Sequence, residues 1–146
     1  MARILIVDDE QMLASTLRTI FATAGHDVET TSNGRSALDR FITSPNYDLV
    51  ITDLIMPDAD GIGLIQSLRT AAPTLGIIAI SGGGRTQKFD LLRMALKLGA
   101  SEVIRKPFST EAIMSAVTKC LAEREKKVAA SDEATVGTGR PIVTGP

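Results

Sequence analysis

The stretch RILIVDDE, residues 3–10, sets an uninterrupted apolar run directly before three acidic residues. An apolar run without polar alternation is typical of a parallel strand that helices cover on both faces. Two similar runs follow, LVI at residues 49–51, in a strand expected over 49–52, and IIAI at residues 77–80. Polar residues interrupt two further runs, at 27–31 and 102–105, so we expect edge strands there. The sequence therefore predicts five strands.

Segments with helical spacing of apolar residues separate these runs. The predicted helices cover roughly residues 13–24, 37–42, 62–71, 86–98 and 110–121. Gly25 and Gly99 act as stop signals for two of them, and Ser109 is a candidate N-cap for the last. Strict alternation of strands and helices is typical of an α/β, doubly wound parallel sheet. Right-handed crossovers then bring the carboxyl ends of the strands to one edge, where ligands bind.

The composition is that of a globular domain. Of the 146 residues, 44% are hydrophobic and 23% are charged, enough to fill one core. The formal net charge of −1 disfavours a nucleic-acid-binding protein, because phosphate neutralisation needs an excess of basic residues. A single cysteine, Cys120, excludes an internal disulfide, and a single histidine, His26, in a turn expected to be exposed, excludes chemistry with two imidazoles. No apolar run approaches about 18 residues, so we expect a cytoplasmic protein without a membrane span.

The end of the chain differs in composition from the rest. From Val128 onward the sequence lacks aromatic residues and hydrophobic periodicity and is rich in Gly, Thr and Pro. Such a segment buries too little surface to offset the entropy of ordering. We therefore expect one domain over residues 1–127 and a disordered tail over residues 128–146.

Polar side chains follow four of the five predicted strands. The residues at these strand ends are Asp8, Asp9, Asp53, Ser81 and Lys106. Because the strand ends share one edge, we expect these side chains to meet. Carboxylates about 4 Å apart repel each other by about 4 kcal/mol at an effective dielectric of about 20. Such a cluster needs a cation, and ligands that are all oxygen atoms suit Mg²⁺.

A divalent cation beside a carboxylate, a lysine and a hydroxyl is suited to phosphoryl chemistry. The cation and the ammonium group neutralise the phosphoryl oxygens, the hydroxyl donates a hydrogen bond, and the carboxylate attacks the phosphorus in line. Asp53, Lys106 and Ser81 are therefore the candidate catalytic residues. A different interpretation of the same residues is a solvated rim with an incidental salt bridge, and a Ser81 hydroxyl that bonds only the local backbone.

Four stretches carry a family resemblance: RILIVDDE at 3–10, VITDLIMPDADGIGLI at 50–65, IIAISG at 77–82 and GASEVIRKPF at 99–108. In residue type, order and position they resemble the receiver domains of two-component response regulators, of the chemotaxis-regulator kind. The resemblance covers about residues 2–122. It implies a flavodoxin-like sheet of five parallel strands in the order 2-1-3-4-5, with five helices.

The resemblance implies a role for each acidic residue. Asp53 matches the phosphoacceptor aspartate. Asp9 matches the direct Mg²⁺ ligand, and Asp8 matches the partner that acts mainly through metal-bound water. Asp53 itself and the backbone carbonyl of Ile55 complete the implied metal ligands.

The resemblance also assigns the groups opposite the acids. Lys106 matches the family's invariant lysine, which pairs with the acceptor carboxylate and later with the phosphoryl group. Its bond to Pro107 resembles one that is cis in the family. Ser81 matches the Ser or Thr whose hydroxyl follows the phosphoryl group on activation, and Gly82 leaves space for that group to enter.

Two departures from the family concern switching and lifetime. Val103 stands where many receivers carry a Tyr or Phe that swings inward, so we expect switching to run through the loop at 82–84 and the fourth helix. Ile55 and Gly83 stand where other receivers often place polar residues that guide a hydrolytic water, so we expect a long-lived phosphoaspartate. The fourth helix has a wider apolar arc than core packing needs, which predicts an outer contact surface.

These inferences converge on a single-domain response regulator. We expect Asp53 to take a phosphoryl group, with Mg²⁺ as cofactor, from a phosphohistidine of a sensor histidine kinase or a histidine phosphotransfer protein. The donor histidine must belong to another protein, because His26, the single histidine of this chain, lies far from the site edge. The protein would then bind a downstream target through the fourth helix and fifth strand, form a homodimer, or pass the phosphoryl group onward. We class it as a signalling switch that catalyses its own modification rather than as an enzyme, and expect it to bind neither nucleic acid nor membrane.

Three alternatives stay open. A Mg²⁺-dependent phosphohydrolase with an aspartate nucleophile would need a second acid two residues after the nucleophile, where this chain has Ile55. A flavodoxin-like FMN carrier needs aromatic side chains around the ring, and only 3% of the residues are aromatic. A pseudo-receiver would act as a scaffold without phosphorylation, which Val103 favours and the intact Asp53 and Lys106 oppose.

Overall fold

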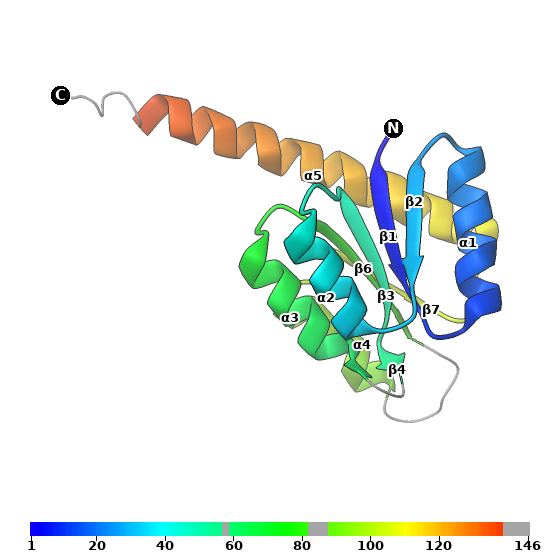
Figure 1. Ribbon diagram of the computed structural model, residues 1–146. Coiled ribbons are helices and arrows are strands. Elements are labelled where there is room, and N and C mark those ends of the chain that lie inside the picture. Colours follow the sequence, from blue (N-terminus) through cyan, green and yellow to red (C-terminus); the bar gives the residue numbers. More distant parts are fainter. Residues whose placement is uncertain (57–58, 82–87, 139–146) are drawn as a thin grey trace.

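A five-stranded parallel sheet forms the centre of the molecule (Figure 1). The computed structural model describes residues 1–56, 59–81 and 88–138. The strands of this sheet are β1 (Arg3–Val7), β2 (Asp27–Thr31), β3 (Leu49–Asp53), β6 (Gly76–Ser81) and β7 (Glu102–Arg105). Their order, β2-β1-β3-β6-β7, is 2-1-3-4-5 when the five strands are numbered along the chain. The predicted flavodoxin-like fold and strand order are confirmed.

Helices cover both faces of the sheet (Figure 1). In the described part of the chain they are α1 (Gln11–Thr23), α2 (Gly34–Thr43), α3 (Gly61–Ala71), α4 (Lys88–Leu98) and α5 (Thr110–Thr138). The buried residues of α1 and α5 join one hydrophobic core, and those of α2, α3 and α4 join a second core on the opposite face. The sheet is therefore the middle of three layers.

The central strands explain why their sequences show no alternation. In β1, Ile4 and Ile6 enter the core beneath α1 and α5, whereas Leu5 and Val7 enter the core beneath α2, α3 and α4. All four side chains are at most 1% exposed. A strand with no solvent-facing side has no place for polar residues, so its run is continuously apolar.

Gly25, Gly99 and Ser109 mark helix ends as predicted, and Asn33 is a further N-cap that was not predicted. The side chain of Asn33 accepts a hydrogen bond from the Ser36 N–H at 2.8 Å, and Ser109 accepts one from the Ala112 N–H at 3.0 Å. Both contacts satisfy N–H groups that have no partner inside the helix. Gly25 and Gly99 follow α1 and α4 and have φ of 98° and 129°. Residues with a Cβ rarely adopt such positive φ values.

A short antiparallel pair, β4 (Ile55–Met56) and β5 (Ala59–Asp60), follows β3 and has no counterpart in the predicted elements. Two-residue strands are too short to show a period of apolar residues. The predicted loop at 82–84 and the start of the fourth helix at 86–87 lie outside the described residues.

The last helix departs from the expected tail. We expected disorder from residue 128, but α5 continues to Thr138 and projects beyond the sheet (Figure 1). Residues 122–130, AEREKKVAA, are mostly strong helix formers, which extend the helix although none of them is fully buried. Residues 139–146 of the expected tail lie outside the described residues, and the domain boundary at 127 stays a prediction.

His26 also differs from its expected exposed position. The imidazole is half-buried, and its Nδ1 accepts a hydrogen bond from the Ala2 N–H at 3.0 Å. Burial, followed by the positive charge of the N-terminus, lowers the pKa of His26 below its usual value. The ring thus connects the start of β1 to the turn before β2.

Candidate functional site

Three carboxylates meet at the carboxyl edge of the sheet, as the sequence predicts. Asp8 and Asp9 follow β1, and Asp53 ends β3. Each offers one oxygen such that the three atoms lie within 4.8 Å of one another. Asp8 and Asp53 are only 3% and 6% exposed, whereas Asp9 is exposed. The adjacency of β1 and β3 in the sheet produces this cluster from residues far apart in sequence.

Lys106, directly after β7, supplies a positive charge to the cluster. Its Nζ lies 3.7 Å from Asp8 Oδ2, 3.6 Å from Asp53 Oδ2 and 3.5 Å from Glu10 Oε1. The lysine side chain is 19% exposed. One ammonium group therefore faces three carboxylates, and two of these are buried.

Burial opposes the charged form of each ionisable group in the site. Burial raises the pKa of Asp8 above its usual value, against a hydrogen bond from the Glu10 N–H at 2.8 Å. Burial likewise raises the pKa of Asp53, against the attraction of Lys106. Burial would lower the pKa of Lys106, but the charges of Asp53, Asp8 and Glu10 outweigh it and raise that pKa. Asp8, Glu10 and Asp53 face the one ammonium group of Lys106, so the ionised groups together carry more negative than positive charge.

The carboxylate cluster fits a hard divalent cation. Asp8 Oδ2 is buried and accepts no hydrogen bond within the described residues, and its contact with Lys106 is long at 3.7 Å. A buried oxygen of this kind normally has a partner. Three carboxylates and no nitrogen or sulfur donor is a ligand set that suits Mg²⁺.

Ser81 and the backbone near Asp53 complete the site. Ser81 ends β6 with no exposed surface, and its Oγ has no hydrogen-bond partner among the described residues. Asp53 Oδ1 accepts a long hydrogen bond, 3.4 Å, from the Ile55 N–H. The Lys106–Pro107 bond is cis, as the resemblance implies.

Two residues of the site were not singled out from the sequence. Glu10 contacts Lys106, although only its place after two aspartates could have drawn attention to it. Gly61 begins α3 directly against the end of β3, because a Cβ there would lie 2.7 Å from Leu54 Cα and still closer to the Asp53 carbonyl oxygen. The sequence around Gly61 carries no local signal that only glycine fits there, because the close approach depends on the tertiary fold.

Two further predicted positions lie at the surface or in the core. The Ile55 side chain is 57% exposed beside the acidic cluster. Val103 in β7 is partly buried against the core beneath α2, α3 and α4. A small aliphatic side chain thus packs at the position where many receivers carry a Tyr or Phe. In α4, Leu92 is buried whereas Met94 and Leu96 are 46% and 48% exposed, which agrees with an apolar surface wider than the core contact.

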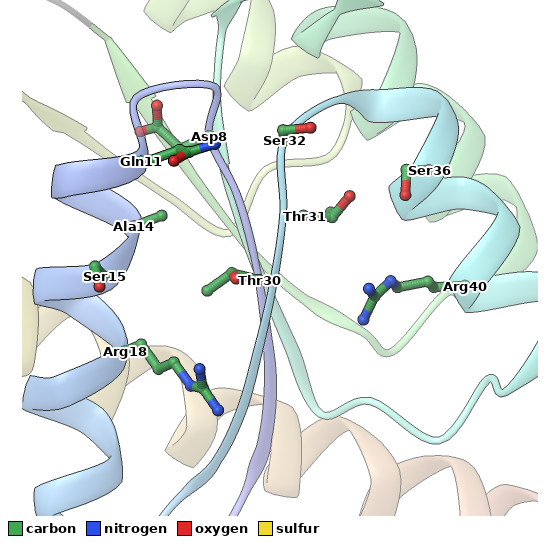
Figure 2. A pocket seen from close by; sticks show the side chains of 10 residues that line it. All are labelled: Asp8, Gln11, Ala14, Ser15, Arg18, Thr30, Thr31, Ser32, Ser36 and Arg40. Atoms are coloured by element: carbon green, nitrogen blue, oxygen red, sulfur yellow. The ribbon is translucent and has the colours of Figure 1, made fainter.

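A cavity of about 470 Å³ adjoins the acidic site through Asp8 (Figure 2). It lies over the edge strand β2, with Ser15 and Arg18 from α1 on one side and Ser36 and Arg40 from α2 on the other. Its lining residues are otherwise polar or small, and none of them is aromatic. The cavity therefore lacks the stacking surfaces that the FMN alternative requires.

The strand order and the strand-end residues together define a flavodoxin-like α/β domain with an acidic, lysine-containing pocket. The sequence model of the response regulator receiver domain matches residues 4–118, and the chain belongs to this family. No helix within the described ranges is long and apolar enough to cross a membrane.

Individual relatives agree with the family. The chain is 35% identical over 120 residues to the DNA-binding transcriptional regulator NtrC of Azospirillum brasilense, covering 82% of this chain and 24% of NtrC. It is 29% identical over 126 residues to the response regulator SaeR of Staphylococcus aureus, covering 86% of this chain and 53% of SaeR. The chain thus spans a quarter to a half of the length of these relatives.

Solved structures of receiver domains have a similar fold. A response regulator receiver domain protein from Clostridium thermocellum superimposes with a TM-score of 0.80 at 28% identity. The match covers 88% of this chain and 99% of that one. The protein is therefore a receiver domain homologous to those of two-component response regulators.

Proposed function

We propose that this receiver accepts a phosphoryl group on Asp53 from a phosphohistidine of a sensor histidine kinase or a histidine phosphotransfer protein. The observation that carries the proposal is the meeting of Asp8, Asp9, Asp53 and Lys106, from three strand ends, in one mostly buried cluster. Surface charges alone would give no reason for carboxylates to be buried side by side. The domain works in the cytoplasm and binds no nucleic acid by itself.

Asp53 is the nucleophile. Its Oδ1 faces the Ile55 N–H and its Oδ2 faces the Lys106 ammonium, so both oxygens are oriented before reaction. A carboxylate oxygen attacks the phosphorus, an O–P bond forms, the P–N bond to the donor imidazole breaks, and the imidazole nitrogen keeps the electron pair. Because Asp53 is ionised when it attacks, no base is needed to activate it.

The remaining groups orient and neutralise the transferred group. Lys106 balances charge on the phosphoryl oxygens. The Ser81 hydroxyl, which has no partner among the described residues, donates a hydrogen bond to one of them. Asp8, Asp9, Asp53 and the Ile55 carbonyl would hold Mg²⁺, which supplies the positive charge that the pocket lacks.

Phosphorylation then acts as a signal. Movement of the Ser81 hydroxyl toward the phosphoryl group shifts a pre-existing equilibrium of α4 and β7, whose exposed Met94 and Leu96 form part of the surface for a downstream target or a second copy. The protein is a switch rather than an enzyme, because the phosphoryl group stays on its own residue until it is hydrolysed or passed onward. With a beryllofluoride mimic, amide chemical shifts of residues 82–98 should change, and unchanged shifts there would reject this route.

The phosphohydrolase alternative is not supported by the site. The position two residues after Asp53 is held by the exposed, apolar Ile55, which has no proton to give to a leaving group. The pseudo-receiver alternative predicts that Asp53 stays unmodified under all conditions.

Incubation with acetyl phosphate and Mg²⁺, followed by intact mass spectrometry, tests the proposal. We expect the wild-type protein and the control variant D39N, at an exposed aspartate of α2, to gain the mass of one phosphoryl group. D53N should gain none. Equal labelling of D53N and wild type would reject Asp53 as the acceptor.

A further inference from the structure

Glu10 is an acidic residue that the proposed chemistry does not use. It occupies the N-cap position of α1, where a side chain commonly accepts a hydrogen bond from the first turn, yet its carboxylate makes no such bond within the described residues. Instead, Oε1 lies 3.5 Å from Lys106 Nζ. The backbone is fixed, since the Glu10 N–H donates to Asp8 Oδ1 and the Glu10 carbonyl accepts from the Ala14 N–H.

Glu10 also lies on the open side of the acidic cluster. Its side chain is 62% exposed, whereas those of Asp8 and Asp53 are 2% and 8% exposed. Together with Lys106, it borders a groove of about 390 Å³. The other lining residues of this groove are Leu13, Pro107 and Phe108. The lysine is therefore reached from solvent beside an additional negative charge.

Two consequences follow for an incoming phosphoryl donor. The Glu10 carboxylate repels a free anion that approaches Lys106 from the groove, and it competes with that anion for the same ammonium group. Both effects oppose small anionic donors before any covalent step begins. A protein donor that places its own surface over the groove can offset this repulsion with other contacts.

We propose that Glu10 is a specificity-determining residue, whose carboxylate beside Lys106 slows phosphorylation by small anionic donors. The inference rests on the proposed phosphorylation of Asp53 and adds the selection of the donor to it. Glu10 touches neither the phosphorus nor its leaving group in this scheme, so it acts through charge and through Lys106.

The test compares E10Q with wild type in phosphorylation by acetyl phosphate and Mg²⁺. A unit charge about 4 Å away in a water-like dielectric changes a rate by roughly fivefold, so we expect E10Q to react about fivefold faster at low ionic strength. Added salt should narrow the difference, because exposed charges are screened. E10D, which restores the charge, should return toward the wild-type rate.

The control is E125Q, which removes an exposed carboxylate from α5 near His26, away from the acidic cluster. It should react at the wild-type rate. Phosphoramidate carries less negative charge than acetyl phosphate near neutral pH, and should show a smaller gain for E10Q. A thermal melt of each variant checks that the fold is intact, which the exposure of Glu10 leads us to expect.

The outcomes separate the two proposals. If wild type is phosphorylated on Asp53 but E10Q reacts no faster than E125Q, or reacts more slowly, the role of Glu10 is overturned and the proposed function stands. If wild type is not phosphorylated at all, both are overturned. A faster E10Q whose advantage disappears with salt supports the proposal.

Discussion

Lys106 carries a large share of the electrostatic balance of the site, and its removal gives a quantitative prediction. In K106M, a side chain of similar length loses its charge, which leaves Asp8 and Asp53 buried side by side. Of the three lost ion pairs, the two with the buried carboxylates, at 3.7 and 3.6 Å, each correspond to about 4–5 kcal/mol at an effective dielectric of about 20.

The destabilisation cannot reach the sum of these energies, because one carboxyl group then takes up a proton. Protonating an aspartate of ordinary pKa, about 3.9, costs about 4 kcal/mol at pH 7. Breaking a buried pair from one side typically costs about 3–5 kcal/mol. We therefore expect K106M to lower the free energy of unfolding by about 3–4 kcal/mol at pH 7.

The sign of the pH dependence follows from the raised pKa values of Asp8 and Asp53. A carboxyl group whose folded pKa exceeds its unfolded pKa favours folding at low pH, and this contribution is lost as the pH rises through the folded pKa. Losing Lys106 raises both folded pKa values further. The deficit of K106M should therefore shrink as the pH is lowered from about 7 to about 5.

Urea unfolding followed by circular dichroism measures both effects. The matched control is K119M, because Lys119 forms an exposed ion pair of 3.4 Å with Glu102. This pair should contribute less than about 1 kcal/mol. A loss of stability in K106M no larger than in K119M, or a deficit that grows as the pH falls, would rule out this role of Lys106.

Three further predictions concern other parts of the chain. The pKa of His26 in the folded state lies below 6.5, so the contribution of the ring to stability is present above that pH and is lost as the pH falls below it. H26A should therefore lower the free energy of unfolding, measured in urea, by about 1 kcal/mol near pH 7.5 and by less near pH 5. In the same urea unfolding assay, G99A should lower the free energy of unfolding by about 2–3 kcal/mol, because a Cβ there would lie 2.8 Å from Arg69 Cγ. G25A, with open space around the added Cβ, should lower it by about 1 kcal/mol. I55N should shorten the lifetime of the phosphoryl group severalfold in a radiolabel chase, by giving a hydrolytic water a polar partner, and an unchanged lifetime would contradict the role given to the apolar Ile55.

Much of the fold follows from local sequence features. The apolar runs predict the three central strands of the main sheet within a residue or two, because these strands are buried on both faces. The polar residues in the other two runs mark the edge strands β2 and β7. Gly25, Gly99 and Ser109 mark helix ends correctly, because each meets a local requirement of the backbone. Strand ends of a parallel sheet share one edge, so the meeting of Asp8 with Asp53 is also predictable.

The missed features depend on contacts between distant segments or on weak local preferences. The place of Glu10 beside Lys106 requires the turn after β1 to meet the turn after β7. The close approach of Gly61 to Asp53 needs the start of α3 to press on the end of β3. The continuation of α5 through residues 122–130 reflects helix propensity without a continuous buried face, which hydrophobic periodicity does not detect.

In the proposed function, the acidic cluster together with a divalent cation makes Asp53 the phosphoryl acceptor. Borohydride reduction of the acetyl phosphate-treated protein, followed by peptide mass spectrometry, tests it most directly, since an aspartyl phosphate is reduced to homoserine. We predict homoserine at residue 53 when Mg²⁺ is present and none after chelation. Homoserine at another aspartate, or the same yield at residue 53 without a divalent cation, would contradict the account.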